Sequence, residues 1–461
     1  MIMGCTSDAG KSFLATALCR HFANRGVRVA PFKAQNMSNN AAVTPDGLEI
    51  GRAQYLQALA ARVTPQARMN PVLLKPSADT YSQVITLGRF DPAISALPWL
   101  ARKEHLWPLV RQSLHSLLAE FDQVVIEGAG SPAEVNLRAS DIVNMRVALE
   151  CEADVYLAVD IDRGGAFAHL LGVWYCLEPA EQARIKGFVL NKFRGDPALL
   201  GNAMDWLQAR TGIPTVAIVP MTRHTLPDED AFHHRAQPLA GQVNIALLLY
   251  PYASNLDEFD PLIHAPGVTV TPVRTAQSLA GFHAVILPGS KNTAQSLRYV
   301  RGEGLDHAIF EAAAAGALIL GVCGGMQMLG RQLLDPGGLE GGDIAGLGLL
   351  DLTTTLAPQK ITGQRAINWN GRTVRGYEIH HGRTEAGPQA QTHLPGGLGW
   401  RQGSLIGVYL HGLLENRSYC QWFLDQLGWR GQAIDWAAHL DQELDRIAGL
   451  VTSTGWVDAL S

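Results

Sequence analysis

The chain opens with a glycine-rich loop that restricts what can fold around it. The loop runs from Gly4 to Ser12 and reads Gly-Cys-Thr-Ser-Asp-Ala-Gly-Lys-Ser. Its glycines let backbone N–H groups curl around phosphate oxygens, while Lys11 neutralises charge and the hydroxyl of Ser12 reaches Mg²⁺. A loop of this kind connects a buried strand to a helix. The sequence therefore predicts an α/β domain built on a parallel sheet.

The surroundings of this loop are unusual in two respects. Five residues, rather than the usual four, separate Gly4 from Gly10. Only three residues precede Gly4, so either the first strand is very short or the natural chain starts upstream of Met1. A helix is still expected over residues 12–24, where apolar residues recur every four positions, and a second helix over residues 51–62.

Short apolar runs alternate with amphipathic stretches through most of the chain, which predicts doubly wound sheets covered by helices. The alternation breaks in a polar stretch at residues 222–242, and a new apolar strand starts at Asn244. We therefore expect a first domain, a linker, a second domain and a C-terminal helical segment at residues 1–225, 226–242, 243–430 and 431–461. A fragment from about Asn244 onward is expected to fold alone.

Charge and cysteine content exclude several classes of partner. The 461 residues include 37 Lys and Arg against 42 Asp and Glu, which gives no electrostatic reason to expect nucleic acid or an anionic membrane. The uncharged stretch 312–330 is interrupted by Gly316, Gly321, Gly324 and Gly325 and indicates a strand, a turn and a helix rather than a membrane span. The six cysteines form no C-x-x-C pair. We expect a cytoplasmic protein without nucleic-acid or membrane partners.

Acidic residues follow the apolar strands of the first domain. Glu127 comes directly after such a run, where a parallel sheet presents its carboxyl ends to a ligand. Mg²⁺ prefers one or two carboxylates together with phosphate and water, so Glu127 and Ser12 are expected to hold it, with Asp46 as a third candidate. Asp160 and Asp162 repeat the arrangement at the next strand.

A cysteine in the second domain has the pattern of a nucleophile. Cys323 ends an apolar run, and glycines and a helix follow it, as in a nucleophile elbow. The helix N-terminus lowers the thiol pKa, and Gly324 and Gly289 are the expected sources of oxyanion-binding N–H groups. His411 follows another apolar run and is the expected base. The polar segment 376–383 either lines the cleft or forms a surface hairpin.

A phosphate loop and a separate thiol–His site together indicate ATP-dependent amide synthesis, in which one site makes ammonia and the other activates a carboxylate. The motifs that carry a closer resemblance lie at residues 6–12, 30–37, 69–77, 125–134, 160–165, 191–196, 287–293 and 321–325. Through them the chain resembles the cobyric acid synthases, the glutamine-dependent amidases of cobalamin biosynthesis, over nearly its whole length.

The resemblance implies a fold and a reaction. The first half is expected to be P-loop-like, similar to dethiobiotin synthetase. The second is expected to be a flavodoxin-like class I glutamine amidotransferase domain of the cobyrinate–cobyrate type. The implied reaction is the stepwise amidation of the b, d, e and g carboxylates of adenosylcobyrinic acid a,c-diamide, giving adenosylcobyric acid. Each step uses one glutamine and one ATP with Mg²⁺ through an acyl phosphate, and no prosthetic group is implied.

The resemblance also assigns residues. The expected ATP- and phosphate-binding residues are Thr6, Asp8, Gly10, Lys11, Ser12 and Asn191, whose amide could read an adenine edge. The expected substrate-side residues, which would meet the corrinoid polycarboxylate, are Lys33, Gln35, Asn36, Asn70, Lys75, Asp160 and Asp162.

One position departs from most class I glutaminases, and two alternatives stay open. The acid that usually follows the histidine by two residues is Leu413 here, as in the cobyrinate–cobyrate subgroup, so a Cys–His pair without that acid is expected. The first alternative is a cobyrinic acid a,c-diamide synthase, although residues 32–36 and 70–75 look more like the cobyric acid type. The second is a P-loop partition or regulatory ATPase, which would not need Cys323 and His411.

Overall fold

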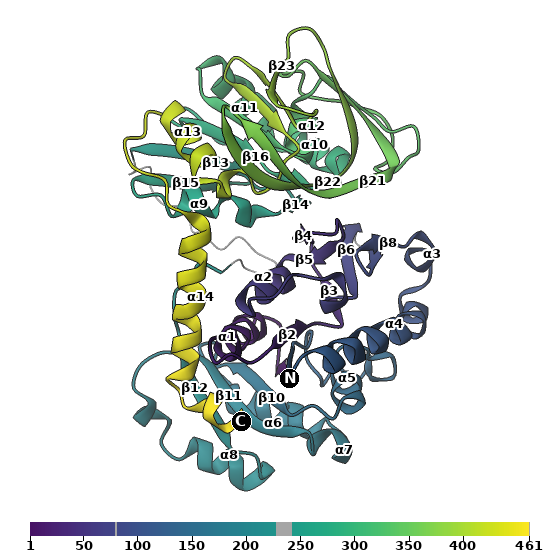
Figure 1. Cartoon of the computed structure of the whole chain (residues 1–461), viewed down its shortest axis with the longest axis vertical. Helices are drawn as coiled ribbons and strands as arrows, with labels where there is room; N and C mark the ends of the chain where they lie inside the picture. The colour runs from purple at the N-terminus through teal and green to yellow at the C-terminus, as the bar shows by residue number, and fades with distance from the viewer. Residues whose placement is uncertain (79–80, 227–241, 461) are drawn as a thin grey trace.

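The computed structural model describes residues 1–78, 81–226 and 242–460. These residues form two α/β units, which we call the N-terminal half (described residues up to 226) and the C-terminal half (residues 242–433). A long helix from the end of the chain runs from the C-terminal half along the side of the N-terminal half (Figure 1). Each half has its own buried apolar core.

The N-terminal half is built on parallel strands in two groups, ordered β1-β10-β11-β12 and β2-β9. Their bounds are β1 Ile2–Gly4, β2 Val29–Phe32, β9 Gln123–Ile126, β10 Val155–Asp160, β11 Ile185–Phe193 and β12 Thr215–Pro220. A parallel bridge between Ile2 and Glu127 joins the two groups. The three-residue β1 therefore lies between β9 and β10, and its central position buries Ile2 and Met3 almost completely.

Helices cover this sheet. Their bounds are α1 Lys11–Asn24, α2 Arg52–Ala60, α4 Trp99–Glu120, α5 Met145–Glu150, α6 Ala166–Tyr175, α7 Pro179–Gln182 and α8 Ala203–Thr211. The first two match the helices expected over residues 12–24 and 51–62 within two residues at each end. Among the helices of the described ranges, none is both long and apolar enough to cross a lipid bilayer.

An insertion after β2 forms two small sheets on the side that faces the C-terminal half (Figure 1). They are ordered β3-β6-β7-β8 and β4-β5. The bounds are β3 Gln35–Met37, β4 Ala41–Val43, β5 Glu49–Gly51, β6 Val72–Ala78, β7 Tyr81–Thr86 and β8 Arg89–Phe90, with α3 at Pro92–Ser95. α2 follows β5 directly and lies within the insertion, and the chain returns to the main sheet at β9 through the long helix α4.

The C-terminal half has a seven-stranded sheet ordered β15-β13-β16-β18-β25-β24-β23. The first five strands are parallel, and β24 and β23 are antiparallel. The strands span β13 Val243–Leu248, β15 Val268–Val273, β16 Ala284–Leu287, β18 Leu318–Val322, β23 Gln391–Leu394, β24 Gly399–Gln402 and β25 Leu405–Val408. The helices span α9 Asp260–Ile263, α10 Thr293–Gly302, α11 Leu305–Ala314, α12 Gly324–Leu329 and α13 Arg417–Gln426.

A long antiparallel hairpin of β21 (Leu352–Trp369) and β22 (Arg372–Ala386) lies beside this sheet and reaches the insertion of the N-terminal half (Figure 1). Its contacts with the β4–β5 turn are direct. The Thr362 hydroxyl donates to the Gly47 carbonyl at 2.9 Å, and the Gln364 amide donates to the Val43 carbonyl at 2.8 Å. The polar segment at residues 376–383 is therefore part of a hairpin.

Helix α14 (Trp436–Thr452) packs on α1, the helix that follows the glycine-rich loop. Leu444, Ile447 and Val451 belong to the apolar core of the N-terminal half. The buried Arg20 of α1 is bonded to Asp441 and lies 3.4 Å from Asp445. A fragment starting at Asn244 would carry this helix with its apolar face uncovered, so we now expect an independent unit to end before α14. The expected linker falls mostly outside the described residues.

We predict that Ile447→Ala loosens the N-terminal half although the residue follows the whole C-terminal half in sequence. Ile447 is fully buried against α1, and deleting a buried Ile side chain to Ala costs about 2–5 kcal/mol. Hydrogen exchange of the α1 amides should accelerate accordingly. Gln442→Ala, on the exposed face of the same helix, is the matched control, and equal effects of both variants would contradict the packing described.

Candidate functional site

The glycine-rich loop between β1 and α1 closes over the carboxyl end of the N-terminal sheet. The Lys11 ammonium donates to the carbonyls of Thr6 at 3.1 Å and Gly130 at 3.3 Å. Gly10 has φ +89°, and a Cβ added there would lie 2.0 Å from Nδ2 of Asn191. Asp8 is also left-handed, with φ +59°. The loop therefore requires glycine at position 10 for both its conformation and its close approach to Asn191.

Asn191, near the carboxyl end of β11, contacts the backbone of the loop. Its side-chain amide is buried and donates to the Ala9 carbonyl at 2.9 Å. One N–H of this amide is thus used by the loop, and the expectation that the amide reads an adenine edge stays a prediction that would use its other N–H or its oxygen. Sequence alone could not distinguish the two roles, since both place an amide at the end of the same strand.

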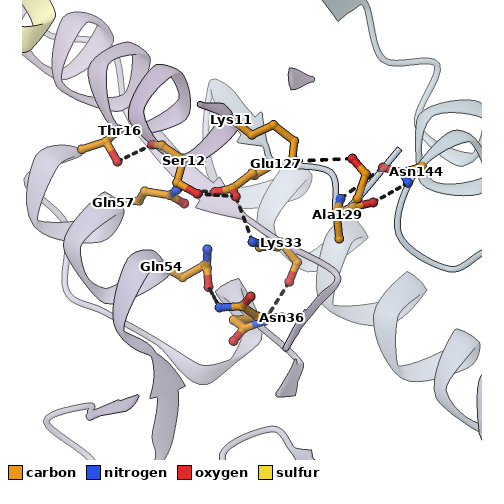
Figure 2. Close-up of polar contacts among 12 residues, drawn as sticks. Lys11, Ser12, Thr16, Lys33, Asn36, Gln54, Gln57, Glu127, Ala129 and Asn144 are labelled. Carbon is orange, nitrogen blue, oxygen red and sulfur yellow. Dashed lines mark hydrogen bonds and ion pairs between the residues drawn. The ribbon is translucent and has the colours of Figure 1, made fainter. Parts of the chain in front are cut away.

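Glu127 gathers polar groups from three segments, as Figure 2 shows. Its Oε1 accepts from the Ser12 hydroxyl at 2.7 Å and from the Lys33 ammonium at 2.8 Å. Its Oε2 accepts from the Gln57 amide of α2 at 2.5 Å. Glu127 and Lys33 are 1% and 3% exposed, so this is a buried ion pair that is satisfied on both carboxylate oxygens. The two expected metal ligands, Ser12 and Glu127, are in direct contact.

A cavity opens above the loop between the main sheet and the insertion. The side chains that give it a positive character come from four segments. The lining includes Asp8, Gly10, Lys11, Ser12, Thr16, Asn36, Ser38, Asn40, Arg52, Arg163 and Lys192. Four of these are Lys or Arg and one is acidic, so the cavity favours an anionic ligand.

Two acidic residues expected on the substrate side instead pair with cations beside the loop. Asp160 accepts from Lys192 at 2.9 Å, and Lys192 also donates to the Asp8 carbonyl at 2.6 Å. Asp162 pairs with Arg194 at 3.0 Å. Asp160 therefore holds a lysine of the phosphate cavity in place.

The remaining substrate-side candidates lie in or next to the insertion, where most are tied to one another. The Asn70 amide donates to the Lys33 carbonyl at 3.0 Å, and its oxygen accepts from the Gly51 N–H at 3.2 Å. The Asn36 amide donates to Gln54 at 3.1 Å (Figure 2). Asn70 thus has a role in the local fold, while Asn36 also lines the cavity.

The other members of this set form ion pairs or hydrogen bonds of their own. The Lys103 ammonium donates to the side-chain oxygen of Gln35 at 2.8 Å. Lys75 is buried and bonded to Glu49 of β5. Asp46 lies in the exposed β4–β5 turn, where it accepts from the Thr44 hydroxyl. The structure therefore does not bring Asp46 to the Ser12–Glu127 contact, and we withdraw it as a metal ligand.

Cys323 occupies a strained turn between β18 and α12. Its backbone has φ +51° and ψ −108°, a conformation that non-glycine residues rarely adopt and that is typical of functional turns. The turn fits closely against the neighbouring strand β16, because a Cβ at Gly325 would lie 2.0 Å from the Leu287 carbonyl oxygen. The elbow predicted from the sequence is therefore present.

His411 and the two glycines expected at the oxyanion site surround the thiol. The Cys323 thiol interacts with the imidazole of His411 and contributes to the raised pKa of that ring. A Cβ on Gly289 would lie 3.1 Å from Cε1 of His411, and a Cβ on Gly324 would lie 2.8 Å from the Ser290 nitrogen. The three strand ends that carry these residues thus meet at one edge of the sheet.

The acid that is absent two residues after His411 is replaced by one from elsewhere in the chain, Glu258. This residue lies in the short helix η4 (Leu256–Phe259), and its Oε1 is 2.9 Å from Nδ1 of His411. Its Oε2 accepts from the Gly412 N–H at 3.1 Å. Burial disfavours a charged imidazole, but the Glu258 carboxylate and the Cys323 thiol outweigh it and raise the pKa of His411 to about 10. The arrangement is a Cys–His–Glu triad.

The hairpin strand β22 forms another wall of this site. The Tyr377 ring stacks on His411 with centroids 5.2 Å apart, and the two residues also pair through their backbones. His380 is 5% exposed and bonded to Glu378 at 3.1 Å. The segment 376–383 is thus both a hairpin and a lining of the cleft, which the sequence left open.

Comparisons with known proteins agree with this geometry. A family described as the CobQ/CobB/MinD/ParA nucleotide binding domain matches residues 1–231, and one described as the CobB/CobQ-like glutamine amidotransferase domain matches residues 244–419. A cobyric acid synthase of Deinococcus radiodurans is 55% identical over 98% of this chain and 97% of that protein. One from Variovorax paradoxus is 52% identical over 90% of each chain. The chain belongs to the cobyric acid synthases.

Membership in this family confirms the expected fold class and the general reaction. The synthase is an α/β protein with a P-loop nucleotide-binding half and a class I glutamine amidotransferase half. It is an enzyme of glutamine-dependent amidation in cobalamin biosynthesis, and its nucleotide-binding half implies ATP.

Sequence reasoning missed Glu258 and Gln57, and only the first had a usable signal. Glu258 follows the apolar strand β13, and the rule that pointed to Glu127 after β9 could have pointed to an acid here as well. Gln57 lies inside a helix with no motif around it. Its role depends on how α2 packs against β9, which no local pattern reveals.

We predict that Gly10→Ala abolishes ATP binding by the synthase. A Cβ at this position would overlap Nδ2 of Asn191, so the loop must move. Gly26→Ala is the matched control, because Gly26 also has a positive φ, of +79°, but open space around its Cα. It should cost about 1 kcal/mol of stability and leave ATP binding intact. Titration calorimetry with ATP measures both, and equal affinities would contradict the assigned role.

Proposed function

We propose that this synthase amidates the b, d, e and g carboxylates of adenosylcobyrinic acid a,c-diamide to give adenosylcobyric acid. Each amide would use one glutamine and one ATP. One observation carries the proposal. The chain has a Cys–His–Glu triad in its C-terminal half and a phosphate loop in its N-terminal half, and the two halves are bonded to each other. This pairing of ammonia release with carboxylate activation has no use in a partition or regulatory ATPase.

The C-terminal half supplies ammonia. The Cys323 thiolate attacks the side-chain amide carbon of glutamine, and the oxyanion that forms accepts from backbone N–H groups at Gly324 and at the Gly289 turn. With its raised pKa, His411 is protonated near neutral pH and donates a proton to the departing ammonia. Neutral His411 then takes a proton from water, which hydrolyses the thioester to release glutamate.

The N-terminal half activates the carboxylate. A corrinoid carboxylate oxygen attacks the γ-phosphorus of ATP, ADP leaves, and an acyl phosphate forms. Ammonia attacks the acyl carbon, a proton is lost to solvent or a base, and inorganic phosphate departs, which leaves the amide. Lys11, Arg52 and Lys192 line the cavity where the phosphate charge would lie. Their role is to hold the nucleotide and stabilise charge in transfer.

The contact of Ser12 with Glu127 fits Mg²⁺, which uses one or two carboxylates together with phosphate oxygens and water. Mg²⁺ bound there would neutralise charge on the β- and γ-phosphates. The Lys33 ammonium, 2.8 Å from the same carboxylate oxygen, already places a positive charge at this point. Ser12 and Glu127 are thus the proposed metal ligands. Lys33 contacts Glu127 and is also a substrate-side candidate.

Among the substrate-side candidates, Asn36 lines the cavity and is proposed to face the corrinoid. Lys33, Gln35 and Lys75 stay proposed substrate-side residues whose side chains are buried in bonds to Glu127, Lys103 and Glu49 in this structure. Asn70, Asp160 and Asp162 are proposed to support their neighbours. The free thiols support a reducing, cytoplasmic compartment, since each of the six cysteines is unpaired.

The rival activity, a,c-diamide formation, differs only in which carboxylates react. Mass spectrometry of the corrinoid after incubation with ATP, Mg²⁺ and glutamine tests the proposal. Addition of four amides to the a,c-diamide supports it, and no reaction with the a,c-diamide contradicts it.

We predict that Lys11→Ala abolishes corrinoid amidation with either glutamine or ammonium as nitrogen donor. Loss of a lysine that meets phosphate charge in the transition state should cost on the order of several kcal/mol. The exposed Lys186→Ala is the matched control and should retain activity. Near-normal ammonium-dependent amidation by Lys11→Ala would remove this loop from the phosphoryl-transfer site.

We predict that Cys323→Ser loses amidation from glutamine and keeps amidation from ammonium at alkaline pH. Serine keeps the size of the side chain, but its hydroxyl stays protonated and is a weak nucleophile. Amide formation is measured with each donor separately, and Cys176→Ser, at an exposed cysteine, is the control. Equal loss with both donors would show that Cys323 supports the fold, and normal use of glutamine would exclude it from the chemistry.

A further inference from the structure

The short helix that carries Glu258 is held from the opposite half of the molecule. The Asn255 N–H donates to the side-chain oxygen of Asn40 at 2.8 Å, and the side-chain oxygen of Asn255 accepts from the Ala41 N–H at 3.0 Å. Asn255 is left-handed, with φ +57°, which is uncommon outside glycine. Two bonds from the insertion thus fix the turn from which η4 starts.

Arg52, the first residue of α2, makes the second connection. Its Nε lies 2.5 Å from Oδ2 of Asp257, and its Nη2 lies 2.8 Å from Oε1 of Glu415. Asp257 immediately precedes Glu258, and Glu415 is four residues after His411. The Arg52 side chain is only 14% exposed, so these are largely desolvated contacts. A guanidinium that binds two carboxylates in a fixed geometry joins the two segments that carry Glu258 and His411.

We propose that Arg52 is a positioning residue for the thiol site, which keeps Glu258 within hydrogen-bonding distance of His411 from across the interface between the halves. The inference rests on the proposed function of Cys323 as a glutaminase nucleophile. Arg52 also lines the phosphate cavity, and its own N–H is bonded to the Asn40 carbonyl at 3.2 Å. One arginine therefore belongs to both sites, and a C-terminal half without its partner keeps all three triad residues but lacks the Arg52 contacts beside Glu258 and His411.

A positioning role and a purely electrostatic role predict opposite pH effects. If Arg52 acted only as a nearby positive charge, its removal would raise the pKa of His411. If it holds Glu258 in place, its removal lets the carboxylate move away and lowers that pKa. The titratable and charged groups that surround the pair are Asp257, Tyr250, Lys291, Cys323, Tyr377, His380, Glu415 and Arg52.

The experiment measures glutamine hydrolysis by the full chain between pH 6 and about 10.5. Loss of activity at high pH reports deprotonation of the His411 imidazolium that protonates ammonia. Glu258→Gln serves as the reference and should move this basic limb down by about one pH unit or more. Arg52→Met should move it in the same direction and lower kcat on the order of 10- to 100-fold, with KM for glutamine changed far less. Arg28→Met removes an exposed ion pair with Asp122 and should change neither.

Each outcome is decisive. A basic limb that is unchanged or higher in Arg52→Met overturns the proposal. If that variant does not fold, as judged by its melting temperature, Asp257→Asn cuts the same ion pair with a side chain of the same shape. A basic limb that is unchanged or higher in Asp257→Asn would then overturn the proposal. Failure of the proposed function itself is visible separately, because Cys323→Ala would then hydrolyse glutamine at the parental rate.

Discussion

A buried carboxylate that accepts from a lysine of each half fixes the relation between the two sites. Glu49 of β5 is bonded to Lys75 of the insertion and, at 2.6 Å, to Lys360 of the hairpin strand β21. Burial alone would raise the pKa of Glu49, but the two ammonium groups outweigh it and hold that pKa well below its usual range. Removing one partner of a buried ion pair typically costs about 3–5 kcal/mol, so separation of the halves is unfavourable.

The short helix α2 converts this constraint into two active-site contacts. It starts three residues after Glu49, and its first residue, Arg52, reaches Asp257 in the C-terminal half. Five residues further on, Gln57 donates to Glu127 beside the phosphate loop. A rigid helix of nine residues thus lies between the support of the triad and the carboxylate proposed to bind metal. A shift of α2 would therefore change the contact of Arg52 with Asp257 and that of Gln57 with Glu127 together.

The sequence predicted the features that depend on a few consecutive residues, and it missed those that depend on contacts between residues far apart in the chain. The glycine-rich loop and the Cys323 elbow need a particular backbone over a few consecutive residues, so their composition reveals them. Glu258 lies 153 residues from His411, and the bond between them depends on how strand ends of the sheet meet. The apolar Leu413 argued against an acid near His411, although it excludes only an acid at that position. Asp46 was misassigned because a residue's place in a turn does not fix where its side chain bonds.

The C-terminal helix shows the same limit and has a consequence for folding. An apolar stripe on α14 indicates that the helix is covered but not by which surface. A local sign that α1 contacts another segment was the cation at position 20, which follows a run of apolar residues. The structure pairs this Arg20 with acids more than 420 positions away. Because Ile447 and Trp456 complete the core around α1, the helix behind the phosphate loop cannot be fully packed until the end of the chain is present. The phosphate site of this synthase therefore depends on contacts of high sequence separation, whose loop-closure entropy slows folding.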